Sequence, residues 1–330
     1  MTRFLIAGLG SIGRRHLRNL LSLGEHDVLL FRTHQSTLPD AELLGLPTYT
    51  NLDEALAQEP DGVIVANPTA AHMAVALPAA RAGANLLIEK PIAPSLEDVP
   101  ALQAALQAQG KQTLIGFHFR QHPVLRQVKD LLASGELGRV LSAHAHWGEY
   151  LPAWHPWEDY RLGYAARKDL GGGVVNTLSH PLDYLRWLLG EVESVSALTA
   201  KLSDLEIDTE DHCEAALQLA SGALATVHLD YYQRPPSHAL AITCSGGAIA
   251  WDNASGNAYV YRVDGEAQEL RVPDGFERNA LFLDEMRHFA AICKGEAASV
   301  CSLEDGIAAQ EIALAIHASA ARGGCKVALT

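Results

Sequence analysis

A lysine follows an apolar run at a point where a buried strand would open toward a ligand. Residues 85–88 have the composition of a buried parallel strand, and Glu89-Lys90-Pro91 comes directly after them. The proline ends the strand and turns the chain. Open α/β sheets bind ligands at this edge. The ammonium group of Lys90 could therefore hydrogen-bond a hydroxyl and stabilise the alkoxide that forms on oxidation, with Glu89 orienting it or touching a cofactor.

A glycine pattern near the start of the chain indicates which cofactor this is. Gly8, Gly10 and Gly13 follow the spacing G-x-G-x-x-G, between a predicted strand (residues 3–8) and a predicted helix (residues 12–23). Gly8 would permit a tight turn, Gly10 a close approach to a pyrophosphate and Gly13 close helix packing. The helix start at Ser11 and Ile12 would supply N–H groups to the phosphates. We therefore expect a bound dinucleotide; a plain glycine-rich turn is the alternative.

The end of the second predicted strand (residues 27–31) should select between NAD and NADP. An NAD enzyme usually has an acidic residue there, but this chain has Phe31-Arg32-Thr33-His34; Asp27 opens the strand and Asp40 comes late. Arg32 could pair with a 2′-phosphate through a charge-assisted fork, with Thr33 beside it. We predict NADP over NAD, against the alternative of a solvated surface arginine.

A third stretch, Asn67-Pro68-Thr69, follows the predicted strand at residues 62–66 and so lies at the edge of the sheet where ligands bind. It could line the nicotinamide half of the cofactor, and we group His72, just beyond it, with this set. A helix-starting turn is an equally good interpretation, and both can hold.

A proton acceptor is predicted in the second half of the chain. Gly171-Gly172-Gly173 precede a predicted helix over residues 176–189, in which Asn176 and His180 are spaced i, i+4 and would share one face. Histidine titrates near neutrality and can accept a proton from an alcohol, with the amide as its neighbour. The alternative is a buried histidine with its hydrogen bonds satisfied.

An aromatic loop over residues 150–161 could bind a sugar ring or simply fill a core. The polar and aromatic residues that we assign to substrate binding are Arg120, Trp154, His155, Tyr160, Arg161 and Tyr164.

The predicted elements form two domains. Strands at residues 3–8, 27–31, 62–66, 85–88 and 113–117 alternate with helices at 12–23, 73–82 and 96–109, which is typical of a doubly wound parallel sheet. After a helix at 124–134 and a strand at 140–147, strands follow one another from about residue 190 to 271, which indicates a large, mainly antiparallel sheet. In residues 223–230, alternate side chains would share a face. We expect a Rossmann domain over residues 1–120 and an α+β domain over 121–330, whose final helix could pack back on the first.

Composition narrows the class of protein. A chain of 330 residues exceeds the usual size of a single core. The formal net charge of −14 disfavours nucleic-acid binding. Five scattered cysteines without CxxC spacing indicate reduced thiols and no metal site. No apolar stretch is long enough to span a membrane and no signal peptide is recognisable, so we expect a cytoplasmic protein.

Along almost its full length the chain resembles the glucose-fructose oxidoreductase / inositol dehydrogenase / MocA (Gfo/Idh/MocA) family. The matching motifs are the Gly8–Gly13 loop with Arg14-Arg15-His16, Glu89-Lys90-Pro91, the stretch 171–180 and Ser302-Leu303-Glu304-Asp305-Gly306. The resemblance implies a C-terminal open sheet that makes homodimer or homotetramer contacts. It also implies that Lys90 and His180 stand at the site of hydride transfer, and that the substrate is a sugar, cyclitol or sugar derivative.

One position departs from the family pattern. The family often has an aspartate where this chain has Asn176, and an amide cannot take a proton. Proton transfer would then fall to His180, Lys90 or a tyrosine such as Tyr160. The leading expectation is an NAD(P)-dependent oxidoreductase acting on a secondary alcohol or ketone. The alternatives are a non-catalytic nicotinamide-binding regulator and a trapped-cofactor enzyme that eliminates or cleaves glycosides.

Overall fold

The computed structural model describes residues 2–33, 43–263 and 265–329, so His34 and Asp40 lie outside the described residues. The chain separates into two compact units. Unit 1 comprises Met1–His118 and Glu277–Ile307, and unit 2 comprises Phe119–Phe276 and Ala308–Thr330. Whereas the sequence suggested a single division at residue 120, the second unit is interrupted by a segment that returns to the first. Each unit is described by itself.

Unit 1 contains a six-stranded parallel sheet in the order β3-β2-β1-β4-β5-β6. The strands are β1 (Phe4–Ala7), β2 (Val28–Phe31), β3 (Thr48–Tyr49), β4 (Gly62–Val65), β5 (Asn85–Ile88) and β6 (Thr113–Ile115). Five of them coincide with predicted strands; β3 has only two residues, too few to show a pattern. The order reverses between β1 and β4, which makes this the switch point of a doubly wound sheet. The predicted Rossmann architecture is confirmed.

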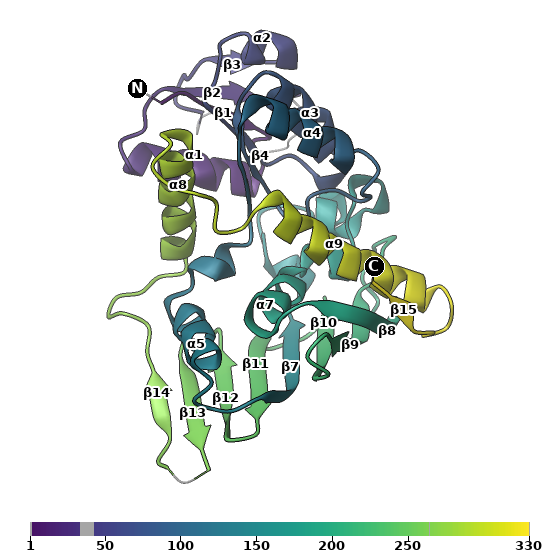
Figure 1. Ribbon diagram of the computed structural model, residues 1–330. Helices are drawn as coiled ribbons and strands as arrows, with labels where there is room; N and C mark the ends of the chain where they lie inside the picture. Colours follow the sequence, from purple (N-terminus) through teal and green to yellow (C-terminus); the bar gives the residue numbers. More distant parts are fainter. Residues whose placement is uncertain (1, 34–42, 264, 330) are drawn as a thin grey trace. The chain divides into compact units, whose positions relative to one another are not determined.

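Helices cover both faces of this sheet (Figure 1). They are α1 (Ser11–Ser22), α2 (Leu52–Leu56), α3 (His72–Arg81), α4 (Val99–Gln109) and, from the far end of the chain, α8 (Asn279–Cys293). Helix α3 packs against α4, and α8 packs against α1. The phenyl ring of Phe289 on α8 lies 6.1 Å from that of Phe4 on β1, so α8 contributes directly to the core of unit 1.

Unit 2 is built on a nine-stranded sheet in the order β14-β13-β12-β11-β7-β10-β9-β8-β15. Its pairings are antiparallel except that of β10 with β7, which is parallel. This confirms the mainly antiparallel sheet. The strands are β7 (Val140–Gly148), β8 (Val192–Ala200), β9 (His212–Leu219), β10 (Leu224–Asp230), β11 (Ser237–Cys244), β12 (Gly247–Asp252), β13 (Ala258–Arg262), β14 (Gln268–Leu270) and β15 (Val327–Ala328).

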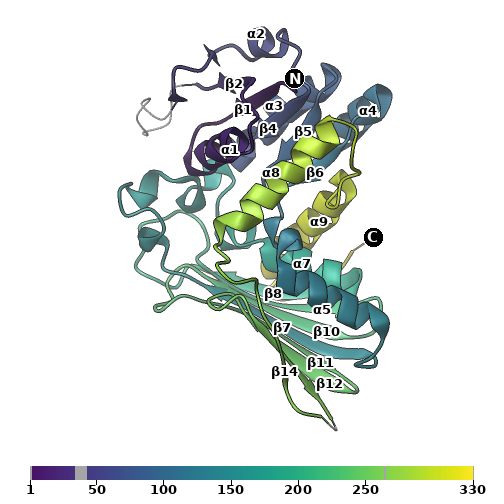
Figure 2. The ribbon, with the colours of Figure 1, turned by 90° about the vertical axis from the view of Figure 1, so that its left-hand side faces the viewer.

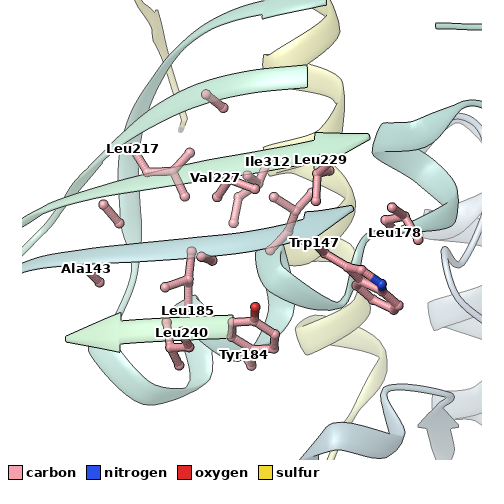
Figure 3. Packing of buried hydrophobic residues seen from close by; sticks show 14 of the residues in the cluster. Ala143, Trp147, Leu178, Tyr184, Leu185, Leu217, Val227, Leu229, Leu240 and Ile312 are labelled. Carbon is pink, nitrogen blue, oxygen red and sulfur yellow. The ribbon is translucent and has the colours of Figure 1, made fainter. Parts of the chain in front are cut away.

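The core of unit 2 lies on one face of this sheet. Helices α5 (Pro123–Ser134) and α7 (His180–Leu189) cover that face (Figure 2), together with the part of α9 (Leu303–Ala320) that belongs to unit 2. As predicted, alternate residues of β10 share a face: Ala225, Val227 and Leu229 are all buried. They meet Trp147 from β7 and Tyr184 from α7 in the packed layer that Figure 3 shows.

The helix predicted over residues 176–189 is not continuous, so that prediction is wrong. A short helix, α6 (Val174–Thr177), ends before α7 begins at His180. Pro181 occupies the first turn of α7, where its missing N–H costs nothing, whereas in a helix continuing from α6 it would leave the carbonyl oxygen of Thr177 without its hydrogen bond. Asn176 and His180 therefore do not share one helix face. Gly190, with a φ of 98°, ends α7 as expected.

None of the helices within the described residues is both long and apolar enough to cross a membrane.

Candidate active site

The three glycines of the β1–α1 turn have different physical roles. Gly8 has a φ of +95°, and a Cβ on it would lie 2.4 Å from the backbone nitrogen of Asn67. A Cβ on Gly13 would lie 1.9 Å from the carbonyl oxygen of Gly8. Both glycines are thus required by the protein's own packing. Gly10 differs, because a Cβ there would have no neighbour within 4 Å, although the loop is tightly built on either side.

The N-terminus of α1 is open toward the same space. Gly10 is its N-cap residue and offers no side chain, so the first N–H groups of the helix have no side-chain cap. A 12-residue helix with uncapped N–H groups, preceded by a residue that leaves room for close backbone approach, fits the pyrophosphate of a dinucleotide. The loop therefore meets the physical requirements that the glycine spacing predicted.

Beside this loop, the turn after β4 is fixed by hydrogen bonds among predicted residues. The amide of Asn67 donates to the carbonyl oxygen of Ala71 (2.8 Å), and Nε2 of His72 lies 2.9 Å from the carbonyl oxygen of Asn67. His72 is buried, and this burial lowers the pKa of its imidazole. Pro68 and the buried Thr69 lead into α3. The turn starts a helix, as one interpretation held, and it also lies at the carboxyl end of β4.

The carboxyl end of β5 carries Glu89 and Lys90. Glu89 Oε1 lies 2.7 Å from Nε2 of His16, a fully buried residue of α1. Burial raises the pKa of Glu89, but the hydrogen bond to His16 and the charges of His16, Lys90 and His72 outweigh it and leave this pKa below its usual value. Lys90 is partly exposed at the end of the strand next to β4. The described geometry therefore leaves Glu89 ionised beside Lys90.

A second carboxyl group faces Glu89 within unit 1. Glu285 comes from α8 and is 2% exposed, and an oxygen of its carboxyl group lies within 4.8 Å of a ring nitrogen of His16 and a carboxylate oxygen of Glu89. Burial, followed by the negative charge of Glu89, raises the pKa of Glu285 well above its usual value. A neutral acid thus lies beside an ionised one. Neither His16 nor Glu285 is among the site residues predicted from the sequence. The sequence pointed to His16 only through its place beside the glycine loop, and no sequence pattern pointed to Glu285.

Arg32 directly follows β2 and is buried, with 6% of its surface exposed. The alternative of a solvated surface arginine is therefore wrong. Its backbone N–H donates to the carbonyl oxygen of Tyr49, which ties it to β3, while Thr33 is exposed.

In unit 2, the amide of Asn176 is held by the glycine stretch before α6. Its Nδ2 donates to the carbonyl oxygens of Gly171 (3.2 Å) and Gly172 (3.3 Å). Its Oδ1 is buried and has no hydrogen-bond partner among the described residues. The amide orientation follows from this, because the opposite one would place an oxygen against two carbonyl oxygens. Asn176 therefore presents an acceptor that no described residue of unit 2 uses.

His180 begins α7 inside an aromatic wall. Its ring lies 5.0 Å from Phe119 in an edge-on arrangement and 5.7 Å from Trp147 in a stacked one. The ring of His238 stacks on the ring of Trp147, with their centroids 4.1 Å apart. The wall is rigid on the β7 side, since Trp147 belongs to the packed core (Figure 3). A histidine held this way can present a nitrogen in a defined direction.

The predicted substrate-binding residues separate into two groups. Arg120 is buried, and its Nε and Nη2 both donate to the carboxylate of Asp183 on α7, with Nη2 at 2.7 Å. The carboxylate balances the charge of Arg120 within unit 2, and the role of Arg120 in substrate binding stays a prediction. Asp183 was not among the predicted site residues. The remaining residues lie in the loop of short 3₁₀ turns before α6, and they are Trp154, His155, Tyr160, Arg161 and Tyr164. The ring of Trp154 lies 5.6 Å from that of Tyr231, and the ring of His155 lies 5.4 Å from that of Trp157.

One of those loop residues, Arg161, lines an open hollow together with residues between 201 and 208. Arg161 is exposed and pairs with Asp159 and Glu206. The hydroxyl of Tyr160 accepts a hydrogen bond from the backbone N–H of Glu206 (3.1 Å). Lys90 belongs to unit 1 and His180 to unit 2.

Comparison with known proteins shows which family the chain belongs to. Residues 2–117 match the model of an oxidoreductase family with an NAD-binding Rossmann fold, and residues 125–250 match the GFO/IDH/MocA C-terminal domain. Together these segments cover more than two thirds of the chain. The chain belongs to the Gfo/Idh/MocA oxidoreductase family. The resemblance inferred from the motifs is thus confirmed.

Several members of the family are similar over different lengths. A 1-carboxy-3-chloro-3,4-dihydroxycyclohexa-1,5-diene dehydrogenase of Comamonas testosteroni is 33% identical over 64% of this chain, but the match spans only 52% of that relative. A D-xylose 1-dehydrogenase (NADP(+)) of Haloferax volcanii is 26% identical over 97% of the chain and 98% of its own length. The solved structure of levoglucosan dehydrogenase with NADH and levoglucosan has a TM-score of 0.87 at 20% identity, covering 99% of both chains, which shows the shared fold.

Proposed function

We propose that this Gfo/Idh/MocA protein transfers a hydride between a nicotinamide dinucleotide and a secondary alcohol or ketone of a sugar, cyclitol or sugar derivative. The observation that carries the proposal is the β1–α1 turn. Gly8 and Gly13 are explained by packing within unit 1, whereas the space at Gly10 and the uncapped start of α1 are explained by a ligand with phosphates.

On the nucleotide side, the residues that would hold the cofactor come from three neighbouring strand ends. Gly8, Gly10, Ser11, Ile12 and Gly13 would hold the pyrophosphate. The nicotinamide half would be bound by the turn after β4 and the end of β5, with Asn67, Pro68, Thr69, His72, Glu89 and Lys90. When bound, the nicotinamide supplies the hydride chemistry. The chain's own task is to orient the two reactants and to move the proton.

The proton of the substrate hydroxyl goes to His180 in the direction of oxidation. As the O–H proton leaves, the ammonium of Lys90 would stabilise the negative charge that develops on the substrate oxygen. Asn176 accepts a hydrogen bond through Oδ1, the atom with no partner among the described residues, and so fixes a second substrate hydroxyl. The loop residues Trp154, His155, Tyr160, Arg161 and Tyr164, with Arg120, complete the substrate contacts in this proposal.

NADP is the proposed cofactor of choice. Arg32 follows β2, and no carboxylate lies at residues 28–33, where NAD enzymes place an acid on the ribose. The relative from Haloferax volcanii uses NADP(+) according to its name, whereas the levoglucosan dehydrogenase structure contains NADH. Both cofactors therefore occur in the family. Replacing Arg32 by alanine should weaken NADP binding while leaving NAD binding unchanged, and equal binding of NADP by both proteins would contradict the assignment.

The sugar-like substrate is supported by these relatives' names, which include D-xylose and levoglucosan. A cytoplasmic location and a homodimer or homotetramer formed through the sheet of unit 2 stay predictions.

The deciding experiment follows nicotinamide absorbance with NADP and NAD against aldoses, cyclitols, sugar acids and nucleotide sugars. We expect turnover with at least one class. Lys90→Met should then lower kcat about 10²–10⁴-fold with nearly unchanged cofactor affinity, because the alkoxide loses its stabilising charge. Lys111→Met is the matched control, since Lys111 precedes β6 at the opposite end of the sheet. Equal turnover of the Lys90→Met variant and the control would exclude the proposed role.

Asn176 favours a second candidate, a regulator that binds the nucleotide without turnover, because its amide cannot accept a proton. A third candidate is a trapped-cofactor enzyme that eliminates or cleaves glycosides. The trapped-cofactor enzyme would retain its nucleotide through purification and consume substrate with no net absorbance change. The regulator would bind NADP(H) more tightly with a sugar ligand present and would consume neither.

A further inference from the structure

The sheet face of unit 2 that lies opposite the hydrophobic core carries a cluster of histidines and carboxylates. The register of the strands creates it. In the parallel pairing of β10 with β7, His228 lies beside His146, and in the antiparallel pairing with β9 it lies beside Glu214. Asp230, at the end of β10, pairs with Gly148. None of these residues takes part in the proposed hydride transfer.

Three potential metal ligands converge in this cluster. One ring nitrogen of His146, one of His228 and a carboxylate oxygen of Asp230 all lie within 4.8 Å of one another. Nε2 of His228 is 2.9 Å from Oδ2 of Asp230, and Nε2 of His146 is 2.7 Å from Oε1 of Gln233. Two imidazoles with carboxylate and amide oxygens suit a divalent ion such as Zn²⁺. Tetrahedral bonds of about 2.0–2.1 Å place ligand atoms about 3.3 Å apart, so small side-chain shifts would be enough.

The converging side chains are themselves held by an outer set of hydrogen bonds. Nδ1 of His228 lies 2.5 Å from Oε1 of Glu214, which leaves Nε2 facing Asp230. Oδ1 of Asp230 accepts from the backbone N–H groups of Tyr232 (2.9 Å) and Gln233 (2.7 Å), which leaves Oδ2 facing His228. The side chain of Asp230 is only 2% exposed. Metal-bound histidines commonly have such a carboxylate on the second nitrogen.

The backbone leaves room for this arrangement at Gly148. A Cβ at that position would lie 2.3 Å from Oδ2 of Asp230 and 2.2 Å from Oε1 of Gln233. Any other residue at position 148 would displace two of the four candidate ligand atoms. The glycine has a φ outside the left-handed region, so the close approach of these side chains is what the missing Cβ permits here.

The charge of the cluster also suits a divalent cation. Asp230 and Glu214 contribute two negative charges, while the rings of His146 and His228 are parallel, with centroids 4.4 Å apart. Two protonated rings at this distance would repel each other. A divalent ion balances both carboxylates and leaves both rings neutral.

We propose that His146, His228, Asp230 and Gln233 form a structural binding site for a divalent transition-metal ion, with Zn²⁺ as the best match. The ion would join β7 and β10 to the turn that follows β10. The other face of β7 presents Trp147 to His180, so the ion would stiffen the strand that supports the aromatic wall.

The test uses chelator-treated full-length protein, titrated with Zn²⁺ by calorimetry and with Co²⁺ followed by visible absorption. We expect one ion per chain, a Co²⁺ spectrum of four-coordinate nitrogen and oxygen ligation, and a higher Tm with Zn²⁺. His146→Gln and His228→Gln should each weaken binding at least about tenfold, and Glu214→Gln should weaken it by about 10–100-fold. The Co²⁺ spectrum of the unaltered protein keeps the test valid if a variant fails to fold.

His144→Gln is the matched control. His144 lies on β7 two residues before His146, on the same sheet face, but its Nδ1 is 2.7 Å from Oγ1 of Thr226, and it is not one of the converging ligands. This variant should bind the ion as the unaltered protein does. Three results would overturn the proposal: no saturable binding, equal weakening by His144→Gln and His146→Gln, or thiolate bands in the Co²⁺ spectrum. The second would indicate a diffuse histidine patch, and the third would place the ion on cysteine.

Discussion

The contrast between Gly10 and Gly13 separates a ligand requirement from a folding requirement at the scale of single residues. Gly13→Ala should destabilise the protein by more than about 2 kcal/mol, because its methyl group would overlap the carbonyl oxygen of Gly8. Gly10 has a φ of −73°, which alanine adopts freely, and its Cβ position is open. Gly10→Ala should therefore change the free energy of unfolding by less than about 0.5 kcal/mol. It should nevertheless weaken dinucleotide binding at least about tenfold, because the methyl group occupies the pyrophosphate's approach.

Urea unfolding and dinucleotide titration of the two variants check this prediction. If Gly10→Ala bound the dinucleotide as tightly as the unaltered protein, the open space at Gly10 would have to be explained in another way. The two measurements are independent, so a folding defect cannot be mistaken for a binding defect.

Asn176 is explained by its neighbours rather than by the family pattern. An ionised aspartate at this position would face the carbonyl oxygens of Gly171 and Gly172 without a donor between them. Burial without donors raises an aspartate's folded pKa above its unfolded value of about 3.9. The variant Asn176→Asp should thus be least stable above that folded pKa and regain stability as the pH falls through it. We expect a loss of about 1–3 kcal/mol at pH 7 that shrinks toward pH 4.

The control for this prediction is Asn176→Ala. It removes the same two hydrogen bonds without adding a charge, so its loss of stability should be the same at both pH values. Thermal unfolding of both variants at pH 4 and pH 7, each relative to the unaltered protein, gives the comparison. Parallel pH profiles would show that the aspartate finds donors that the present arrangement of residues 171–176 does not offer.

At the scale of elements, the protonation of His122 at the start of α5 makes the stability of the protein depend on pH. It is the N-cap residue of α5, and its Nδ1 accepts a hydrogen bond from the backbone N–H of Leu125 (3.4 Å). Burial lowers the pKa of His122 to about 4, whereas an unfolded histidine has a pKa of about 6.5. Between these values the unfolded chain binds more protons. Stability is therefore lost as the pH falls from about 6.5 to about 4, by roughly 3 kcal/mol from this group.

His122→Asn keeps a side-chain acceptor at the helix start but cannot take up the proton. It should be less stable at pH 7, because Trp251 and Phe276 lose a packing partner, and its pH profile should be flatter between pH 6.5 and 4. Chemical denaturation across this range measures both effects. Subtracting the unaltered profile removes the contributions of the other histidines, and an unchanged slope would show that His122 is not the group that titrates.

Most of the individual elements could be predicted from the sequence, because their signals are local. The strand at residues 85–88 is a short apolar run before a proline, and residues 223–230 alternate as a strand does, with Ala225, Val227 and Leu229 buried in β10. The break between α6 and α7 was missed because Leu178 and Ser179 resemble ordinary helix residues. The warning lay in Pro181, which in a continuous helix would leave the carbonyl oxygen of Thr177 without its hydrogen bond. That error placed Asn176 and His180 on a shared helix face that does not exist.

At the scale of the whole molecule, local sequence patterns do not predict which distant elements pack together. Nothing within residues 279–293 indicates that this helix packs on α1, more than 250 residues earlier in the chain. The pairing of Glu285 with Glu89 could not be predicted for the same reason, since it depends on which sheet receives the helix. The histidine cluster of unit 2 likewise depends on the parallel pairing of β10 with β7, an exception in a sheet that is otherwise antiparallel.

We propose that the two units are folding domains, and α8 supplies the test of the first one. A chain of residues 1–118 would expose the surfaces that α8 covers, and Phe289 and Met286 are both fully buried there. Removing two such side chains costs about 1.5–3 kcal/mol each, against a total stability of about 5–15 kcal/mol for a typical domain. The backbone N–H of Ile115 also loses its partner, the carbonyl oxygen of Cys301. Residues 1–118 alone should therefore unfold without cooperativity.

Joining residues 277–307 to residue 118 through a short glycine-serine linker should restore a cooperative thermal transition and dinucleotide binding. The same linked chain with Phe289→Ser is the control, since it keeps the length and composition but loses the contact with Phe4. Calorimetry of the three chains measures the outcome. If residues 1–118 melted as cooperatively as the linked chain, α8 would be an appendage of the first domain rather than part of its core. The carboxyl pair of Glu89 and Glu285 would then depend on the rest of the protein to be assembled.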